Sequence, residues 1–333
     1  MNPYIIVEIG QAHDGSLGTL HSYIDAVSKT GVDAIKFQTH IADAESSPQE
    51  PFRVNFSYED KTRFDYWKRM EFTFEQWVEI KKHCDEVGLE FISSPFSIAA
   101  VDLLEKLNVK KYKIGSGEVT NYLMLDKIAK TGKDIILSSG MSNFNELDDV
   151  FKFLSAYNNK ISVLQCTTQY PTNPENLGLN VITELKNRYK VPVGLSDHSG
   201  KIYPSIAATT LGAEILEFHA VFDRRQFGPD SKSSLEIDEI VTLVEGVSYI
   251  SSAISNPIDK NNNSEFHDLK KIFEKTLSLN KSKRQGEIIK LEDLEAKKPA
   301  LMGVSASDYN FVIGKKLARD LKKWDFINKS DLI

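Results

Sequence analysis

Cysteine is scarce in this chain of 333 residues. Only Cys84 and Cys166 are present, and their spacing matches no metal-binding pair. A disulfide framework is therefore not expected, whereas a reducing compartment is. No apolar run approaches the ~18 residues of a membrane span. No basic segment followed by an apolar stretch opens the chain, as it would in a secretory signal. These absences predict a cytoplasmic protein with no membrane partner.

Basic residues are not in excess either. Lys and Arg number 41 against 47 Asp and Glu, and the resulting net charge of −6 gives no electrostatic reason to expect a nucleic-acid partner. Hydrophobic residues make up 41% of the chain and charged residues 26%, which places it among soluble globular proteins. Its length leaves room for a barrel of ~250 residues and a small second domain.

What the chain does contain is a regular alternation of short apolar runs with amphipathic segments. Segments 75–84 and 147–154, for example, have an apolar residue every three or four positions, which is the period of a helix. Eight strands alternating with such helices favour a (β/α)8 TIM barrel over an open doubly wound sheet. The eight predicted strands are 4–9, 34–38, 90–94, 111–114, 134–138, 161–165, 192–196 and 214–218.

The chain changes character after the barrel. Residues 258–265 are polar and lack any period, which is typical of a linker, and short strand-like runs with turns follow. The predicted domains are therefore a barrel over 1–256, a linker over 257–271 and a small, mostly irregular or β domain over 272–333.

Two histidines, His198 and His219, each follow or end a predicted strand. If these strands are neighbours in one barrel, both imidazoles project from the same carboxyl-end rim, where such folds place their chemistry. A single buried histidine is more often hydrogen-bonded in a core than a ligand. As a pair, however, the two histidines predict a metal site.

Other polar side chains gather at the same strand ends. Lys36 and Lys113 lie within apolar runs, and a buried lysine is costly unless an anion meets it. Two lysines surrounded by hydroxyls suit a small ligand that carries phosphate and carboxylate groups. The hydroxyl-bearing residues at these strand ends include Ser94, Ser116, Ser138, Thr168 and Ser196.

Some conspicuous side chains are expected to be structural. Cys166 is predicted to be a core residue because no histidine base is suggested beside it. The long insertion after the second predicted strand contains Arg69 and is interpreted as a lid or subunit contact rather than a substrate-binding element. The aromatic residues of this insertion are Phe64, Tyr66, Trp67 and Phe72.

Several segments of the chain together resemble the sialic acid synthase family, whose members condense phosphoenolpyruvate with a hexose derivative to make nine-carbon nonulosonic acids. The tail resembles the C-terminal antifreeze-like (SAF) domain of that family in 286–288, 298–299 and 313–315. The resemblance runs from end to end, and its specificity comes from the combination of motifs. The matching barrel segments are 7–16, 33–38, 113–118 with 120–121, 137–141 and 194–199.

The resemblance implies roles for individual residues. His198 and His219 would bind a divalent metal, usually Mn²⁺, with Mg²⁺ or Co²⁺ as alternatives. Gln38, Glu118, Tyr170 and Asp230 would face an amino-sugar aldose. The residues implied to hold phosphoenolpyruvate are Lys36, Ser94, Lys113, Ser116, Ser138, Thr168 and Ser196.

The sequence does not decide which of two carboxylates orients or deprotonates the attacking water. One is Glu118. The other is Asp14, which stands in the Asn-His-acid-Gly turn of the family, where this chain has Ala12 in place of the Asn. Lys113 is implied to act with them by neutralising substrate charge.

The chain also departs from the family pattern. Phe218 stands where a basic residue is common, Ala220 where an aromatic one is, and Ser231 where many members have histidine. Lys298 replaces an arginine that reaches into the barrel of the partner subunit, and it lacks the bidentate fork of that arginine. The resemblance therefore implies a homodimer with swapped C-terminal domains, in which Lys298 acts near the sugar.

The predicted function is a metal-dependent, carbon-carbon bond-forming transferase of cell-surface polysaccharide biosynthesis. It would condense phosphoenolpyruvate with an N-acylated mannose-like or dideoxyhexose sugar and release phosphate by C–O cleavage. Two alternatives remain: a related 3-deoxy-ulosonic acid phosphate synthase, and a non-catalytic scaffold descended from a synthase.

Overall fold

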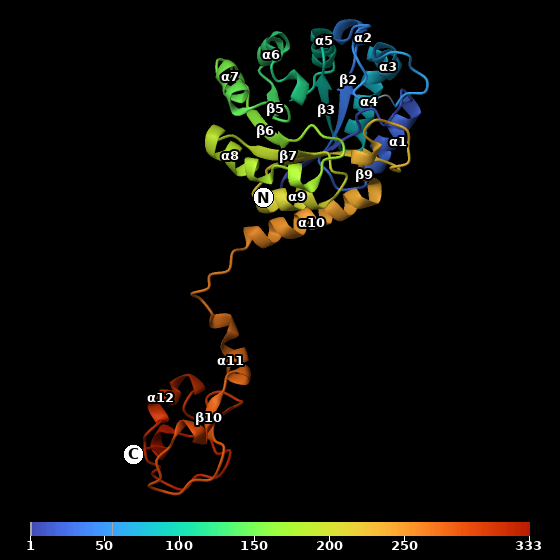
Figure 1. The fold of residues 1–333 in the computed structure, drawn as a ribbon. Coiled ribbons are helices and arrows are strands. Elements are labelled where there is room, and N and C mark those ends of the chain that lie inside the picture. Colours follow the sequence, from blue (N-terminus) through green and yellow to red (C-terminus); the bar gives the residue numbers. More distant parts are fainter. Residues whose placement is uncertain (1, 55) are drawn as a thin grey trace. The chain divides into compact units, whose positions relative to one another are not determined.

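The computed structural model describes residues 2–54 and 56–333, which form two compact units (Figure 1). The first ends at Pro257 and the second begins at Ile258. Within the described residues, no helix is both long and apolar enough to cross a membrane.

The first unit is a closed barrel of eight parallel strands, which confirms the predicted TIM barrel and its eight strands. Each strand pairs with the next along the chain, and β1 closes the barrel against β8. The strands are β1 (Tyr4–Glu8), β2 (Ala34–Thr39), β3 (Glu90–Pro95), β4 (Lys111–Ile114), β5 (Asp134–Ser138), β6 (Ile161–Cys166), β7 (Val193–Asp197) and β8 (Ile215–Val221). A two-residue strand, β9 (Leu235–Glu236), adds to the end of β8.

Helices surround the barrel, and polar capping residues mark the N-terminus of several of them. Thr73 forms a capping box with Gln76 at the start of α4, and Asn143 forms one with Glu146 at the start of α7. Both helices contain segments predicted as helical. The main helices are α1 (Leu17–Val27), α4 (Phe74–Glu86), α5 (Ile98–Lys106), α6 (Tyr122–Ala129), α7 (Phe144–Leu154), α8 (Leu179–Tyr189), α9 (Tyr203–Thr210) and α10 (Ile237–Ser255). Short 3-10 turns η1 (Ser116–Glu118), η2 (Pro174–Asn176) and η3 (Ser231–Ser233) follow β4, β6 and β8.

The barrel interior changes from apolar to polar along the strands. Side chains two positions apart on a strand point to the same face, so successive inward positions form layers. The apolar layer contains Ile6, Ala34, Ile92, Ile136, Leu164 and Ile215. Two positions further toward the carboxyl ends stand Glu8, Lys36, Ser94, Ser138, Cys166 and Glu217, all of them buried. The polar chemistry of the barrel is therefore concentrated at its carboxyl end.

The insertion between β2 and α4 is ordered by a small aromatic core of its own. It contains α2 (Ala42–Glu45) and α3 (Arg63–Met70), and Tyr66, Trp67 and Met70 are buried together in it. Phe72, by contrast, packs into the main core of the barrel.

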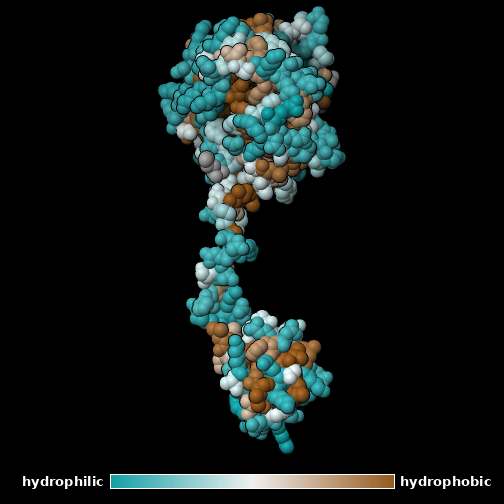
Figure 2. All heavy atoms as spheres, turned by 90° about the vertical axis from the view of Figure 1, so that its left-hand side faces the viewer, coloured by the Kyte–Doolittle hydropathy of each residue, from teal (hydrophilic) through white to brown (hydrophobic). Residues whose placement is uncertain are grey.

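The second unit is small and consists mostly of irregular segments, short turns and two strands. Its core comprises Leu277, Leu279, Ile289, Val304, Val312, Leu317, Leu321 and Ile327. Its elements are η4 (Ser264–Phe266), α11 (His267–Phe273), β10 (Thr276–Leu279), η5 (Leu291–Asp293), β11 (Leu294–Lys297), η6 (Ala306–Asp308), α12 (Tyr309–Val312) and η7 (Lys329–Asp331), with β10 antiparallel to β11. The helix α11 occupies part of the expected linker 257–271, so that this stretch is not wholly irregular. Hydrophobic side chains lie exposed on this unit (Figure 2), among them Phe273, Leu301, Met302 and Trp324.

Candidate active site

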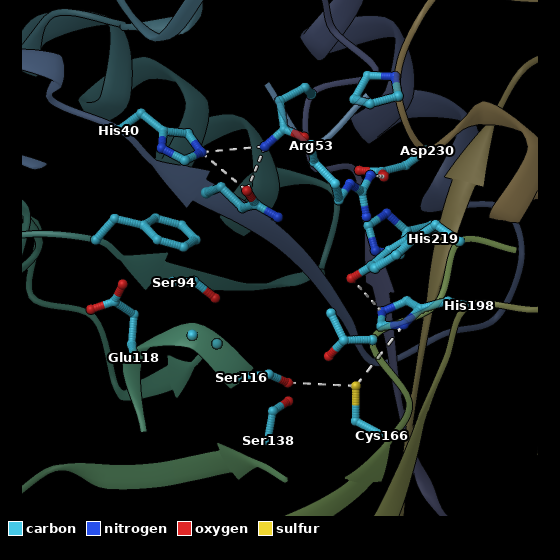
Figure 3. A pocket seen from close by; sticks show the side chains of 18 of the residues that line it. His40, Arg53, Ser94, Ser116, Glu118, Ser138, Cys166, His198, His219 and Asp230 are labelled. Atoms are coloured by element: carbon cyan, nitrogen blue, oxygen red, sulfur yellow. Dashed lines mark hydrogen bonds and ion pairs between the residues drawn. The ribbon is translucent and has the colours of Figure 1, made fainter. Parts of the chain in front are cut away.

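A cavity of about 370 Å³ opens at the carboxyl ends of the barrel strands. The strand order and the period of two bring side chains from β2 to β8 to this one place (Figure 3). The cavity is lined by 13 of the residues that the sequence singled out: Lys36, Gln38, Ser94, Lys113, Ser116, Glu118, Ser138, Thr168, Tyr170, Ser196, His198, His219 and Asp230.

The two histidines lie side by side with a ring separation of 5.3 Å between centroids. His198 Nδ1 lies 2.9 Å from the Thr167 carbonyl oxygen, which can only accept, so Nδ1 carries a proton and a metal could bind only through Nε2. Burial lowers the pKa of His198, but the neighbouring Cys166 outweighs it and raises that pKa. Burial and the neighbouring His198 hold the pKa of His219 well below its usual value, so His219 is a neutral imidazole.

These two rings fit a divalent metal bound through imidazole nitrogens. Among residues 2–54 and 56–333, no group of three or more His, Cys, Asp or Glu side chains is placed to hold a metal ion. A metal held by His198 and His219 would therefore complete its shell with water or substrate and keep open positions, as catalytic metals do.

The two lysines are each paired with a carboxylate of the protein itself. Lys36 Nζ contacts Glu8, and Lys113 Nζ lies 3.1 Å from Glu217 Oε1, which is also 3.9 Å from Lys36 Nζ. Burial raises the pKa of Glu217, but Lys113 and Lys36 outweigh it and lower that pKa to about 2. Lys113 also donates to Ser138 Oγ at 2.6 Å.

This pairing corrects one step of the sequence argument. The burial of Lys36 and Lys113 does not by itself require an anionic ligand, because Glu8 and Glu217 already offset both charges. Glu8 stands opposite Lys36 in the β1–β2 register, and Glu217 is on the same face of β8 as His219. The period of two could have revealed Glu217 in the sequence, since it precedes His219 by two positions.

A model of the NeuB family matches residues 23–259, and relatives extend the match over both units. The N,N'-diacetyllegionaminic acid synthase of Campylobacter jejuni is 34% identical over 331 residues, covering 98% of each chain. The chain belongs to the NeuB family. The human N-acetylneuraminate-9-phosphate synthase is 31% identical, with 97% of this chain and 91% of the human protein covered. Among solved structures, the N-acetylneuraminic acid synthetase of Leptospira borgpetersenii in complex with citrate has a TM-score of 0.72 at 26% identity, over 81% of this chain and 90% of that one.

The two carboxylates that the sequence left open lie in different surroundings in this NeuB protein. Glu118 lines the cavity, accepts a hydrogen bond from Asn121 Nδ2 at 2.8 Å, and has its pKa raised by burial. Asp14 does not line the cavity. It adopts a left-handed backbone (φ 49°), and its carboxylate accepts a hydrogen bond from Arg69 at 2.5 Å. Here Glu118 is the carboxyl group placed to meet a bound substrate.

Lys298 is the other predicted site residue that does not line the cavity. It belongs to the second unit, where its ammonium lies 4.8 Å from the centre of the Phe273 ring. Its predicted role in the site of a partner subunit remains a prediction.

One interpretation from sequence needs correction at the cavity wall. Cys166 is buried, but its thiol lines the cavity, 4.0 Å from His198 Nδ1 and 3.7 Å from Ser116 Oγ (Figure 3). It is therefore not a plain core residue, because β6 and β7 are neighbours and bring a histidine beside it. Tyr66 and Trp67 of the insertion line the cavity too, and their interpretation as part of a lid or subunit contact stays a prediction.

Sequence reasoning missed His40 altogether. Its ring lies between Trp67 and Phe96 at centroid distances of 3.9 and 4.5 Å. Its Nδ1 lies 2.6 Å from Glu45 Oε1, and its Nε2 lies 3.0 Å from Gln38 Oε1. The carboxylate fixes the imidazole, which in turn fixes the amide of Gln38 at the cavity. The signal in the sequence was the spacing of two between Gln38 and His40.

Proposed function

We propose that this NeuB family protein is a nonulosonic acid synthase that condenses phosphoenolpyruvate with an N-acylated mannose-like or dideoxyhexose sugar. The proposal rests mainly on one observation: two lysines, several hydroxyls and two imidazoles that could bind a metal line a single cavity at the carboxyl ends of the strands. The synthase names of the relatives support it. These relatives match nearly the whole chain, so the proposal covers both formation of the carbon-carbon bond and release of phosphate.

Each part of the cavity has a task in that reaction. Lys36 and Lys113, with the hydroxyls of Ser116 and Ser138, would hold the phosphate and carboxylate of phosphoenolpyruvate. A divalent metal, proposed to be Mn²⁺, would be held by His198 and His219 and would polarise the sugar aldehyde. These charges would orient the methylene carbon (carbon 3) of phosphoenolpyruvate toward the aldehyde carbon, where the new carbon-carbon bond forms and the aldehyde oxygen becomes a hydroxyl.

Glu118 is proposed to accept the proton that the attacking water loses. Bond formation at the methylene carbon leaves carbon 2 of phosphoenolpyruvate, which bears the phosphate oxygen, electron-poor. Water adds to carbon 2, and phosphate then leaves by cleavage of its C–O bond to that carbon, which becomes the keto carbon of the product. Burial raises the pKa of Glu118 inside the cavity, which makes its carboxylate a stronger base toward the attacking water than an exposed carboxylate would be.

The test is a phosphate-release assay with purified protein, Mn²⁺, phosphoenolpyruvate and a panel of N-acetylmannosamine-type and dideoxyhexose sugars. We expect release with at least one sugar, and mass spectrometry should then show a product that is three carbons longer. Omitting the sugar is the control, because phosphate release without it would indicate simple hydrolysis. Silence across the panel, with metal bound, would contradict the proposal.

We also propose that the second unit is an antifreeze-like domain that completes the site of a partner subunit in a swapped dimer. Its exposed Phe273, Leu301 and Trp324 support this, because an apolar surface on a small unit suits a docking face. A cytoplasmic location is proposed as well, with the two free cysteines in its support.

Truncation after Asn261 tests the swapped site. The shortened chain is expected to keep phosphoenolpyruvate binding and to lose most sugar turnover, since the barrel cavity remains but its proposed cover does not. Mixing it with a His198→Ala chain should restore part of the activity, because one site of the heterodimer combines an intact barrel with an intact tail. Inactive mixtures despite confirmed subunit exchange, or a fully active monomer, would rule out the swap.

A further inference from the structure

The side chain of His40 lines the cavity, and none of the chemical steps proposed above uses it. Only 5% of its surface is exposed. It follows the last residue of β2 and stands two positions after Gln38, which lines the cavity as well. In Figure 3, His40 and Glu118 lie on one side of the cavity, and His198 and His219 lie on the other.

Both ring nitrogens of His40 face an oxygen atom. Nδ1 lies 2.6 Å from Glu45 Oε1, and Nε2 lies 3.0 Å from Gln38 Oε1. Carboxylate and amide oxygens only accept hydrogen bonds, so each ring nitrogen has to carry a proton. The ring is then an imidazolium, and it is paired with the buried carboxylate of Glu45.

Two aromatic rings enclose His40 and suit a positive charge on it. Trp67 is stacked at 17° to the imidazole plane and Phe96 at 13°, with centroid distances of 3.9 and 4.5 Å. The negative face of an aromatic ring attracts a cation. The stacking also holds the plane of the imidazole, so Nε2 stays directed at Gln38.

The charge of His40 determines which way round the Gln38 amide stands. Gln38 Oε1 accepts hydrogen bonds from His40 Nε2 and from Gln11 Nε2. If the amide were turned over, its NH2 group would face the protonated Nε2 of His40, and two donors would oppose each other. In the observed orientation, Gln38 Nε2 has no hydrogen-bond partner among residues 2–54 and 56–333. This NH2 group is therefore free to donate to a ligand in the cavity.

We infer that His40 is a positioning residue: held as an imidazolium by Glu45, it directs the NH2 group of Gln38 toward the sugar. Gln38 then recognises a hydrogen-bond acceptor, such as a hydroxyl or carbonyl oxygen, and not a donor. The inference rests on the proposed function and specifies what this part of the cavity requires of the sugar.

His40→Phe tests the positioning role, because phenylalanine keeps an aromatic ring between Trp67 and Phe96 but has no N–H group to hold the amide. With the sugar of the panel that the wild type uses best, the KM for the sugar should rise about 10-fold, while the KM for phosphoenolpyruvate should stay within about twofold. His40→Gln should recover most of the loss, since its own amide can donate to Gln38 Oε1. A purely structural role would give the opposite order, because glutamine stacks less well than phenylalanine.

Gln38→Glu tests the orientation of the amide. The new carboxylate can pair with the imidazolium of His40, so the midpoint of thermal unfolding should not fall. It offers the ligand an oxygen in place of NH2, however, and the KM for the sugar should rise about 10-fold or more. Unchanged sugar binding by this variant would show that the amide oxygen faces the ligand, which contradicts the inference.

The charge of His40 is measured directly by NMR on full-length protein with ¹⁵N-labelled histidine, with His40→Gln used to assign the signals. Near neutral pH, both ring nitrogens should have the chemical shifts of an imidazolium. A neutral ring, or a KM for the sugar within about twofold of wild type in His40→Phe, would overturn the inference alone.

His83→Phe is the matched control, because the His83 ring also meets a carboxylate, Asp25, at 3.1 Å but lies outside the cavity. It should change neither KM. Absence of turnover by the wild type with every sugar would overturn the proposed function, and the role of Gln38 toward the sugar with it. The NMR measurement needs no turnover, so a failure of the His40 charge remains distinguishable from a failure of the proposed function.

Discussion

Replacing His198 or His219 with alanine is expected to lower the rate of phosphate release by at least ~100-fold. Each variant removes one of the two imidazoles that the structure places side by side in the cavity. A metal left with one protein ligand binds weakly and loses its position against the sugar aldehyde. The fold should persist, because both rings lie at the carboxyl-end rim of the barrel rather than in its apolar layer.

The measurements are the steady-state rate with added Mn²⁺ and the metal content of the dialysed protein by elemental analysis. Circular dichroism spectra should be unchanged. His21→Ala is the matched control, because His21 lies in α1 away from the cavity and contacts His83 instead. Wild-type turnover by enzyme freed of metal with a chelator would refute the metal role directly.

Lys113→Met is expected to abolish measurable phosphoenolpyruvate binding and also to destabilise the barrel. The methionine removes the closest positive charge from buried Glu217, which keeps a hydrogen bond from Ser196 and has its other cationic partner, Lys36, 3.9 Å away. Breaking a buried ion pair in this way costs about 3 kcal/mol or more. For a unit of this size, the midpoint of thermal unfolding should fall by roughly 6–12 °C.

A double variant separates the two effects of Lys113. Lys113→Met/Glu217→Gln should recover most of the lost stability, since no unpaired charge remains, but it should not recover ligand binding. Lys111→Met is the control on the same strand: Lys111 pairs with Glu90 at the partly exposed end of β4, so its loss should cost about 1 kcal/mol at most. Normal phosphoenolpyruvate binding by Lys113→Met would remove this lysine from the site. A double variant as unstable as the single one would show that the ion pair is not the source of the loss.

The barrel could be predicted from the sequence because its organisation is sequential. Each strand pairs with the next one along the chain, so the order of apolar runs and helical segments is already the order of the sheet. For the same reason Lys36, Lys113, His198 and His219 could be assigned to one rim from the sequence alone. Their proximity follows from the strand count and from a side-chain period of two.

Contacts between distant segments could not be predicted in this way. Arg53 and Asp230 are 177 positions apart, and Arg53 comes from an insertion that has neither the strand period nor a long helix. Asp14 was assigned to the reacting carbons, yet Arg69, 55 positions later, holds its carboxylate away from the cavity lining. Such pairings depend on the path of loops, and loop paths follow from turn geometry and local packing rather than from a repeating pattern.

The carboxylates Glu8 and Glu217 show most clearly what could not be predicted from the sequence. The sequence alone indicated two buried lysines that needed negative charge and a rim that would collect polar groups. The β1–β2 register sets Glu8 against Lys36, and closure of β1 against β8 places Glu217 where it meets Lys113 and Lys36, so the protein supplies this charge itself. Local periodicity determines which face of a strand is polar, whereas the partners across that face are determined by register and closure, which involve the whole barrel.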